Sequence, residues 1–312
     1  MLPLSGVAAA KIIGCNESGY FSVYETDRYG FRNPVGSWRD AEVIDLAFVG
    51  DSYTAGDCVS EGDHFVDHLR GDFPNVLNLG TGGSGPLFEL AVIREYLRGR
   101  RVSYVFRIYF ERNDLMDLSA RRDDPILSKY LEPDATQDLP LRHRELDSAL
   151  RQYVDDRLTA KAAGEARILP NLRLLLWRAR HRRGGTQKAA ENSSEYDLRI
   201  LQRIVLAART TVEELGGRLV FVYLPEYERF SRDTPSAPWS GARLKSRVVQ
   251  MILSSRIDII DVENAFRQAG EPLRLFPFGM QGHYNPAGYA IVADEIRRYL
   301  TLQEEAVTVV DR

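Results

Sequence analysis

Three things are scarce in this chain: cysteine, net charge and long apolar runs. The two cysteines, Cys15 and Cys58, are too few for a disulfide framework and are not spaced as a metal site. The 41 basic and 44 acidic side chains leave a net charge of −3, which gives no overall attraction to nucleic acid or anionic lipid. No stretch approaches the roughly 18 apolar residues that a membrane-spanning helix needs. What is left is a chain of 312 residues with ordinary hydrophobic content, long enough to bury a site.

The cellular compartment stays open. The cysteines are either two free thiols or one bridge that ties the N-terminal segment to the loop six residues after Ser52, and a bridge would require an oxidising compartment. The first ten residues, MLPLSGVAAA, lack the charged start and apolar core of a signal peptide. A periplasmic or other extracytoplasmic location is therefore expected only if Cys15 and Cys58 pair or if an upstream export signal is missing.

Apolar strand-like segments alternate with helical patterns along most of the chain. Strands are expected at 43–50, 75–80, 102–110, 218–225 and 257–262. Helices are expected at 63–73, 86–98, 195–215, 240–254 and after Asn285. This alternation predicts an α/β fold, a three-layer α/β/α sandwich with a central parallel sheet, whose site lies beyond the carboxyl ends of the strands.

Two segments depart from the alternation. Residues 1–40 are rich in aromatic and turn residues and are predicted to form a short hairpin and loop covering the main domain at 41–312. Residues 118–194 form a charged insertion, predicted to be helical and to act as a lid or partner surface. Its basic amphipathic part, 167–183, could contact a membrane or another protein, although such helices more commonly bury their Leu and Trp side chains in the core. Residues 184–194 are expected to be a flexible connector.

Ser52 follows the first expected strand, in the sequence GDSYTAG, and is expected to open a helix. Backbone N–H groups and the helix dipole at that position favour a developing negative charge, which suits a nucleophile. A serine at a helix start is more often a cap. The choice between the two roles depends on residues elsewhere in the chain.

A glycine-rich loop, NLGTGGSGP at 78–86, follows the second expected strand. Gly80, Gly82 and Gly85 have the G-x-G-x-x-G spacing of a dinucleotide-binding loop. However, no acidic residue stands between Arg98 and Arg107, where such a loop needs one to hold a ribose hydroxyl. Glycines also leave backbone N–H groups free to point at an oxyanion, and this use is favoured here.

Two further polar residues belong to the same predicted edge of the sheet. Asn113 follows the third strand in YFERND, where its amide could donate to an oxyanion or form an ordinary polar strand end. His283 precedes the last helix in GHYNPAGY. The five histidines have no metal-ligand spacing, so neither a metal nor a cofactor is expected.

Ser52 in GDSYTAG, Gly83 in NLGTGG, Asn113 in ERND and His283 in GHYNPAGY occur in the order and strand positions of the SGNH hydrolases, also called the GDSL esterase/lipase family. The chain resembles that family from residue 43 to about 300, apart from the insertion. The resemblance implies a flavodoxin-like three-layer fold and hydrolysis of acyl esters on carbohydrates or lipids. It also implies that Ser52 is the nucleophile and His283 the base. The oxyanion hole would comprise the Ser52 and Gly83 N–H groups and the Asn113 amide.

The chain departs from the family pattern at two places. Arg112 stands before Asn113 where the family usually has glycine, and this cation could close the pocket or bind an anionic substrate. The family's acid usually stands two or three residues before the histidine, where this chain has Gln281 and Met280. Gln281, a backbone carbonyl, or an acid from elsewhere such as Asp261 or Glu263 must then orient His283.

The sequence therefore predicts a serine esterase that removes a short-chain or acetyl group from a glycan or similar alcohol by a Ser-His acyl-enzyme mechanism. Transfer of the acyl group to a sugar hydroxyl is the nearest alternative. A catalytically weakened domain that binds glycans or partner proteins is another. A nucleic-acid partner is not expected.

Overall fold

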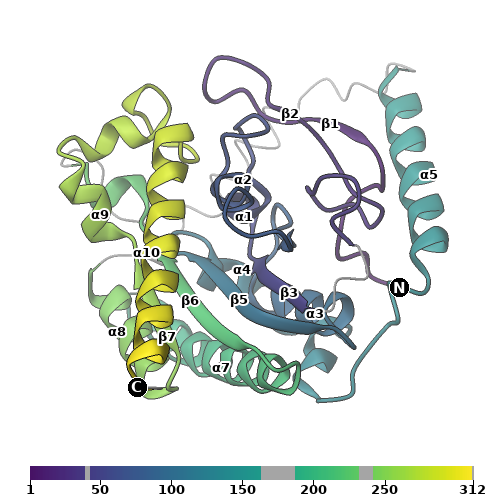
Figure 1. Ribbon diagram of the computed structural model, residues 1–312. Coiled ribbons are helices and arrows are strands. Elements are labelled where there is room, and N and C mark those ends of the chain that lie inside the picture. Colours follow the sequence, from purple (N-terminus) through teal and green to yellow (C-terminus); the bar gives the residue numbers. More distant parts are fainter. Residues whose placement is uncertain (39–42, 163–186, 232–241, 311–312) are drawn as a thin grey trace.

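The computed structural model describes residues 1–38, 43–162, 187–231 and 242–310. Its centre is a parallel sheet with the strand order β4-β3-β5-β6-β7 (Figure 1). These strands are β3 (Val43–Val49), β4 (Val76–Asn78), β5 (Arg101–Phe110), β6 (Arg218–Leu224) and β7 (Asp258–Asp261). Counted along the chain, the order is the 2-1-3-4-5 order of flavodoxin-like sheets. The predicted fold class is confirmed.

Helices cover both faces of this sheet. One face carries α3 (Pro86–Tyr96), α4 (Asp114–Arg121), α7 (Gln187–Glu214) and α8 (Ala242–Ser254), and the other carries α2 (Phe65–Leu69), α9 (Glu263–Gln268) and α10 (Pro286–Val310). Strand β5 contributes Val105 and Tyr109 to the first core and Phe106 and Ile108 to the second. Burial on both faces explains why the central strands are almost continuously apolar in sequence.

Two of the helix starts are set by proline, as expected. Pro86 and Pro286 are the first residues of α3 and α10, where the missing N–H has no intrahelical partner to lose. The expected connector at 184–194 is wrong from Gln187 onward, because α7 already begins there and continues as a single helix into the sheet-covering part. The amphipathic segment 167–183 lies outside the described residues.

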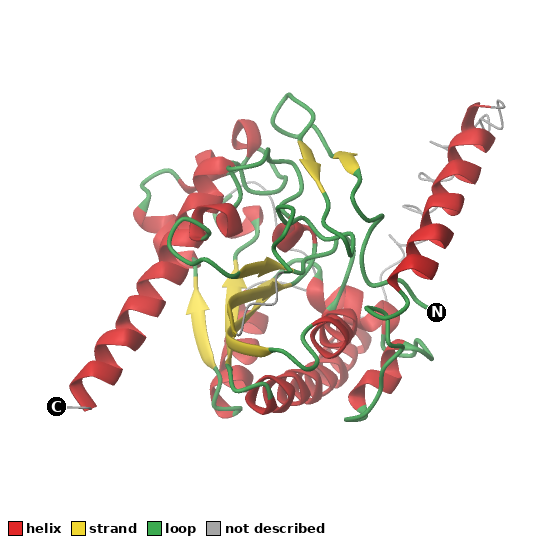
Figure 2. Ribbon diagram, turned by 45° about the vertical axis from the view of Figure 1, so that its right-hand side comes forward, coloured by secondary structure: helices red, strands yellow, loops and turns green. Residues whose placement is uncertain are grey.

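Two of the long helices extend beyond the sheet on opposite sides of the molecule. Figure 2 shows α10 running down to the C-terminus on one side and α5 (His143–Ala162) standing on the other. The start of α5 contacts the N-terminal segment, since the Asp147 carboxylate accepts a hydrogen bond of 2.8 Å from the Ala8 N–H. Within the described ranges, no helix is both long and apolar enough to cross a membrane.

The N-terminal segment contains the predicted hairpin and is fixed to the end of the sheet. Strands β1 (Lys11–Ile13) and β2 (Val23–Glu25) pair antiparallel. Farther along, the buried Asn33 side chain accepts from the Asn78 N–H at 2.8 Å and donates to the Asn78 carbonyl at 2.9 Å. Because Asn78 is the last residue of β4, this pair of bonds holds the segment at the carboxyl ends of the strands.

Candidate active site

Ser52 lies where the strand order of the sheet reverses. It is the first residue of the short helix α1 (Ser52–Ala55), which follows β3, and Asn113 follows the neighbouring strand β5. Ligands of doubly wound sheets bind outside the strand ends at this reversal. Asp51 caps α1, because its carboxylate accepts from the Tyr53 N–H at 2.9 Å. The capping role that Ser52 could have had belongs to its neighbour, which leaves the Ser52 hydroxyl free for chemistry.

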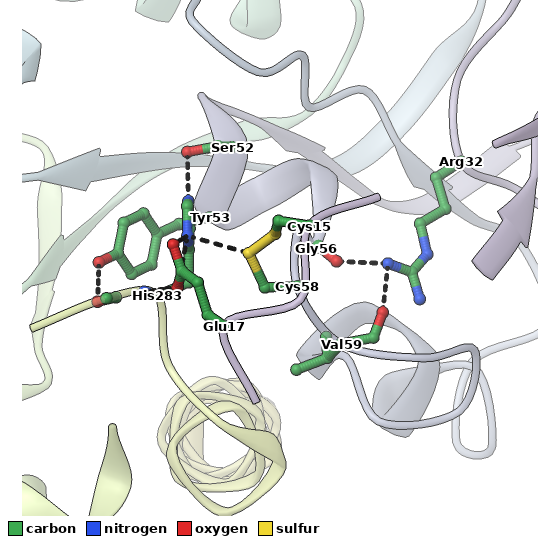
Figure 3. Close-up of a disulfide and its surroundings, with 10 residues drawn as sticks. Cys15, Glu17, Arg32, Ser52, Tyr53, Gly56, Cys58, Val59 and His283 are labelled. Atoms are coloured by element: carbon green, nitrogen blue, oxygen red, sulfur yellow. Dashed lines mark hydrogen bonds and ion pairs between the residues drawn. A yellow bond between two sulfur atoms is a disulfide. The ribbon is translucent and has the colours of Figure 1, made fainter. Parts of the chain in front are cut away.

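The His283 ring faces this hydroxyl. His283 Nε2 lies 2.9 Å from Ser52 Oγ, within the distance that a base needs to take the serine proton (Figure 3). The loop before α10 is held by Tyr53, whose hydroxyl donates to the Gly282 carbonyl at 3.0 Å and whose ring lies 4.8 Å from the His283 ring. The His283 side chain is 20% exposed, so a substrate can reach it.

Glu17 occupies the position of the acid that the last motif lacks. Both carboxylate oxygens lie 3.2 Å from His283 Nδ1, and one accepts from the His283 backbone N–H at 2.7 Å. Of the orienting groups that the sequence left open, the structure therefore has an acid from elsewhere in the chain. The choice of Gln281 is wrong, since its amide donates to Glu228 at 2.6 Å instead. Asp261 is likewise engaged elsewhere, in an ion pair with Lys245 at 2.5 Å. Glu263, the other acid considered, also pairs with that lysine.

A disulfide fixes Glu17 in this position. Cys15 is bonded to Cys58, which lies in the connection after α1 (Figure 3). Of the two arrangements that the sequence leaves open, the structure therefore has the bridge. It places the residue two positions after Cys15 beside the His283 ring, and Cys58 Sγ itself lies 3.4 Å from His283 Nδ1. Glu17 was missed in the sequence because 266 positions separate it from His283. Pairing of the cysteines was the one signal that could have pointed to it.

Glu17 and His283 shift each other's pKa values in the direction that stabilises the ion pair. Burial lowers the His283 pKa and is the largest single influence, but the hydrogen bond and charge of Glu17, helped by Asp57 and Asp51, outweigh it and raise the pKa. Burial likewise raises the Glu17 pKa, and the bonds to His283 outweigh it and lower the pKa. The pair therefore favours a proton on the ring once His283 has accepted one from Ser52.

The expected oxyanion donors lie around Ser52. The glycine-rich loop packs against the serine, since a Cβ added to Gly82 would stand 3.9 Å from Ser52 Cβ. Gly83 has a φ of +70°, a conformation that a side chain would strain, and a Cβ there would meet open space. Asn113 Nδ2 donates one hydrogen to the buried Asp51 carboxylate at 3.0 Å. The Asn113 side chain also hydrogen-bonds the Asp117 carboxylate, so an oxyanion would replace one of its two carboxylate partners.

Arg112 does not point a free cation at the site. Its guanidinium forms an ion pair with Glu228 and lies 3.4 Å from Glu226. Gln281 donates to the same Glu228 carboxylate, so this group joins the ends of β5 and β6 to the loop that carries His283. Arg112, which stands where the family usually has glycine, is thus held in place by an ion pair.

His64 supports the turn that carries Ser52. It is buried, and its Nε2–H donates to the Tyr53 carbonyl at 2.9 Å, while Nδ1 accepts from the Val66 N–H at the start of α2. Burial is the largest cause that lowers its pKa, to about 3, and the positive charge of Arg32 adds to it. The ring is therefore neutral in the folded protein throughout the neutral and mildly acidic range.

Acid is expected to destabilise the protein through His64. Its pKa is lower in the folded state than the ordinary 6.5, so the unfolded chain binds the proton more tightly and stability is lost as pH falls from 6.5 toward 3. At about 1.4 kcal/mol per pH unit, this contribution falls by about 2 kcal/mol between pH 7 and pH 5. Urea unfolding at both pH values should therefore show the stability of the wild type relative to His64→Gln falling by that amount, because groups common to both proteins, such as Glu89, cancel in the difference. His68→Gln, on the same helix, serves as the control, and an equal loss in all three proteins would contradict the prediction.

Comparisons with known proteins find similarity to solved structures, at low sequence identity. No protein-family model and no curated protein matches it. The structure is similar to an α/β hydrolase from the metagenome of Lake Arreo, Spain, with 15% identity and a TM-score of 0.41 over 81% of this chain and 92% of that one. An acetyl xylan esterase is 12% identical, with a TM-score of 0.45 over 82% of this chain and 99% of that one. A lipase/acylhydrolase from Enterococcus faecalis is 11% identical, with a TM-score of 0.41 over 83% of this chain and 96% of that one. Such similarity does not transfer an activity to this chain.

Proposed function

We propose that this protein is a serine hydrolase that cleaves carboxylic esters through a covalent acyl-enzyme. The proposal rests on one observation, the hydrogen-bonded chain from Ser52 Oγ through both nitrogens of His283 to Glu17. A nucleophile beside a base, with the base oriented by a third group, is the arrangement that activates serine. The resemblance to SGNH hydrolases at Ser52, Gly83, Asn113 and His283 agrees with it.

The reaction proceeds in two half-reactions. Ser52 Oγ attacks the acyl carbon while His283 Nε2 takes its proton, and the ring then gives that proton to the departing alcohol as the ester bond breaks. A water molecule attacks the acyl-enzyme in the same way, which releases the carboxylic acid and restores the serine. Glu17 accepts the Nδ1–H throughout, which keeps the Nε2 lone pair toward Ser52. The Ser52 and Gly83 N–H groups and the Asn113 amide stabilise the oxyanion.

A small cavity beside the glycine-rich loop supports a short acyl group as the bound part of the substrate. The cavity has a volume of about 140 Å³, and its lining includes Tyr24, Thr26, Thr81 and the half-buried Asp57. Gly82 separates it from Ser52, because a Cβ there would stand 3.1 Å from Asp57 Oδ2 and 3.9 Å from Ser52 Cβ. So small a volume suits an acetyl group better than a long alkyl chain.

Two features of the sequence favoured the alternative, a catalytically weakened domain that only binds glycans or partner proteins. The first feature was the missing acid before His283, but the Glu17 carboxylate lies beside His283 Nδ1 in the structure. The second feature was Arg112, whose guanidinium is paired with Glu228. Neither feature therefore favours binding over catalysis.

Labelling with a fluorophosphonate tests the proposal. Intact-mass analysis of the wild type should show one adduct, which peptide mapping places on Ser52, and the adduct should be absent in Ser52→Ala and His283→Ala. Ser60→Ala, a half-buried serine in the same connection, should label like the wild type. Folded wild-type protein that takes no label would sink the proposal. Turnover of 4-nitrophenyl acetate with and without a sugar acceptor then separates hydrolysis from acyl transfer.

A further inference from the structure

Four side chains with metal-binding atoms, one of them His283, lie close together. Cys15, Glu17, Cys58 and His283 each offer one ligand atom, and these atoms all lie within 4.8 Å of one another (Figure 3). They come from the N-terminal segment, the connection after α1 and the loop before α10. Sequence spacing alone gave no sign of such a group, because its members are brought together only by the fold.

The separations of His283 Nδ1 from Cys58 Sγ and from Glu17 are close to those of a small tetrahedral metal site. His283 Nδ1 lies 3.4 Å from Cys58 Sγ and 3.2 Å from either Glu17 oxygen. In a tetrahedral zinc site with bonds of about 2.0–2.3 Å, neighbouring ligand atoms are about 3.3–3.8 Å apart. Two thiolates, an imidazole and a carboxylate form a donor set that zinc accepts. In the structure the two sulfur atoms are joined to each other, so this set exists only after reduction.

We propose that reduction of the Cys15–Cys58 disulfide creates a zinc site at Cys15, Glu17, Cys58 and His283, and that zinc bound there inhibits the enzyme. A dithiol reductant transfers two electrons and two protons to the disulfide, which gives two thiols and the reductant's own disulfide. Zinc then displaces the two thiol protons, and the single ring proton of His283 moves from Nδ1 to Nε2 as the metal takes Nδ1.

Inhibition follows from the two nitrogens of one imidazole, and this step rests on the proposed function. A neutral ring with zinc on Nδ1 must carry its proton on Nε2. Nε2, which lies 2.9 Å from Ser52 Oγ, can then donate a hydrogen bond to the serine but cannot accept its proton. Zinc also occupies the Glu17 carboxylate that would otherwise orient the ring. The metal therefore removes the base without touching the nucleophile.

Cobalt and zinc titrations of the reduced full-length protein test the inference. Protein reduced with a phosphine and kept free of oxygen should bind one cobalt ion with thiolate-to-cobalt charge-transfer absorption, and zinc should displace it. The oxidised wild type and the reduced Cys15→Ser/Cys58→Ser variant should show no such absorption. In parallel, one equivalent of zinc should slow fluorophosphonate labelling of reduced wild type by about 10²-fold or more. A chelator should reverse this, and the rate in the double variant should not respond to zinc.

The two readouts separate this inference from the proposed function. If oxidised protein labels at Ser52 but the reduced protein gives no cobalt-thiolate absorption, the metal site is wrong and the hydrolase stands. If the reduced protein binds cobalt and zinc through thiolates yet the oxidised protein never labels, the metal site stands and the hydrolase is wrong. Zinc binding that leaves the labelling rate unchanged would overturn the inhibitory role.

Discussion

Replacement of Glu17 by glutamine is expected to lower kcat/KM for ester hydrolysis by about 10⁴-fold, as amide replacement of a triad acid does in serine proteases. The carboxylate accepts the Nδ1–H of His283 and thereby presents the lone pair of Nε2 to Ser52. A glutamine amide can donate to Nδ1 instead, which would leave the proton on Nε2 and the ring in the wrong tautomer. The loss should appear mainly in kcat, because Glu17 positions the base and does not touch the substrate.

The pH profile distinguishes this role from a merely structural one. The base must be neutral to act, so activity is lost as pH falls through the His283 pKa, which Glu17 raises. Without the carboxylate this pKa falls, and the acid limb of the residual activity should move to lower pH. Glu25→Gln, on the exposed face of the same hairpin, should change neither the rate nor the limb. An unchanged acid limb in Glu17→Gln, or a loss of less than tenfold, would mean that another group orients His283.

The site residues that were predicted from the sequence lie next to recognisable strands and helices. Ser52, Gly83 and Asn113 each follow a buried strand, and parallel strands bring their carboxyl ends to one edge of the sheet. His283 was found because the Asn285-Pro286 pair marks the start of the last helix. Strand periodicity and helix signals therefore predict both the fold and the half of the site that the sheet carries.

Glu17 has no such signal, because it lies in an irregular loop whose place is set by a disulfide. The alternative in which Cys15 and Cys58 pair contained this information, but two cysteines alone do not say whether they pair. Gln281 was the wrong choice for a related reason. Closeness in sequence to His283 suggested it, whereas its side chain follows the loop away from the ring toward Glu228. Side-chain direction in loops depends on tertiary partners that periodicity does not reveal.

The second large effect is expected on the free energy of unfolding when Arg107, a buried arginine near the site, is replaced. Arg107 on β5 is 1% exposed, and its guanidinium lies 2.7 Å from the Glu89 carboxylate and 3.8 Å from that of Asp114. Asp114 is the first residue of α4, directly after Asn113, and its carboxylate accepts from the Phe110 N–H at 2.5 Å. This group of charges therefore fixes the backbone on which the predicted oxyanion donor stands.

Arg107→Met should lower the free energy of unfolding at pH 8 by about 3–5 kcal/mol, since it leaves two carboxyl groups buried without their cation. Burial is the main cause that raises the Glu89 pKa, to about 7 against an ordinary value of 4.5, although Arg107 opposes it. A raised carboxyl pKa means that the folded state holds the proton more tightly, so this group destabilises the protein increasingly as pH rises from 4.5 to 7 and by a constant amount above that. At pH 6, below the pKa of the folded state, the carboxyl is mostly neutral and needs no cation, so the Arg107→Met penalty should be smaller at pH 6 than at pH 8.

Denaturant unfolding of three variants separates charge from packing. Arg101→Met, at the exposed start of the same strand, should cost little at either pH. Arg107→Met combined with Glu89→Gln should be more stable at pH 8 than Arg107→Met alone, because the second change removes one of the unpaired charges. If the double variant is no better than the single one and the penalty is the same at both pH values, Arg107 acts through the volume of its side chain. The charge group would then have no part in holding Asn113.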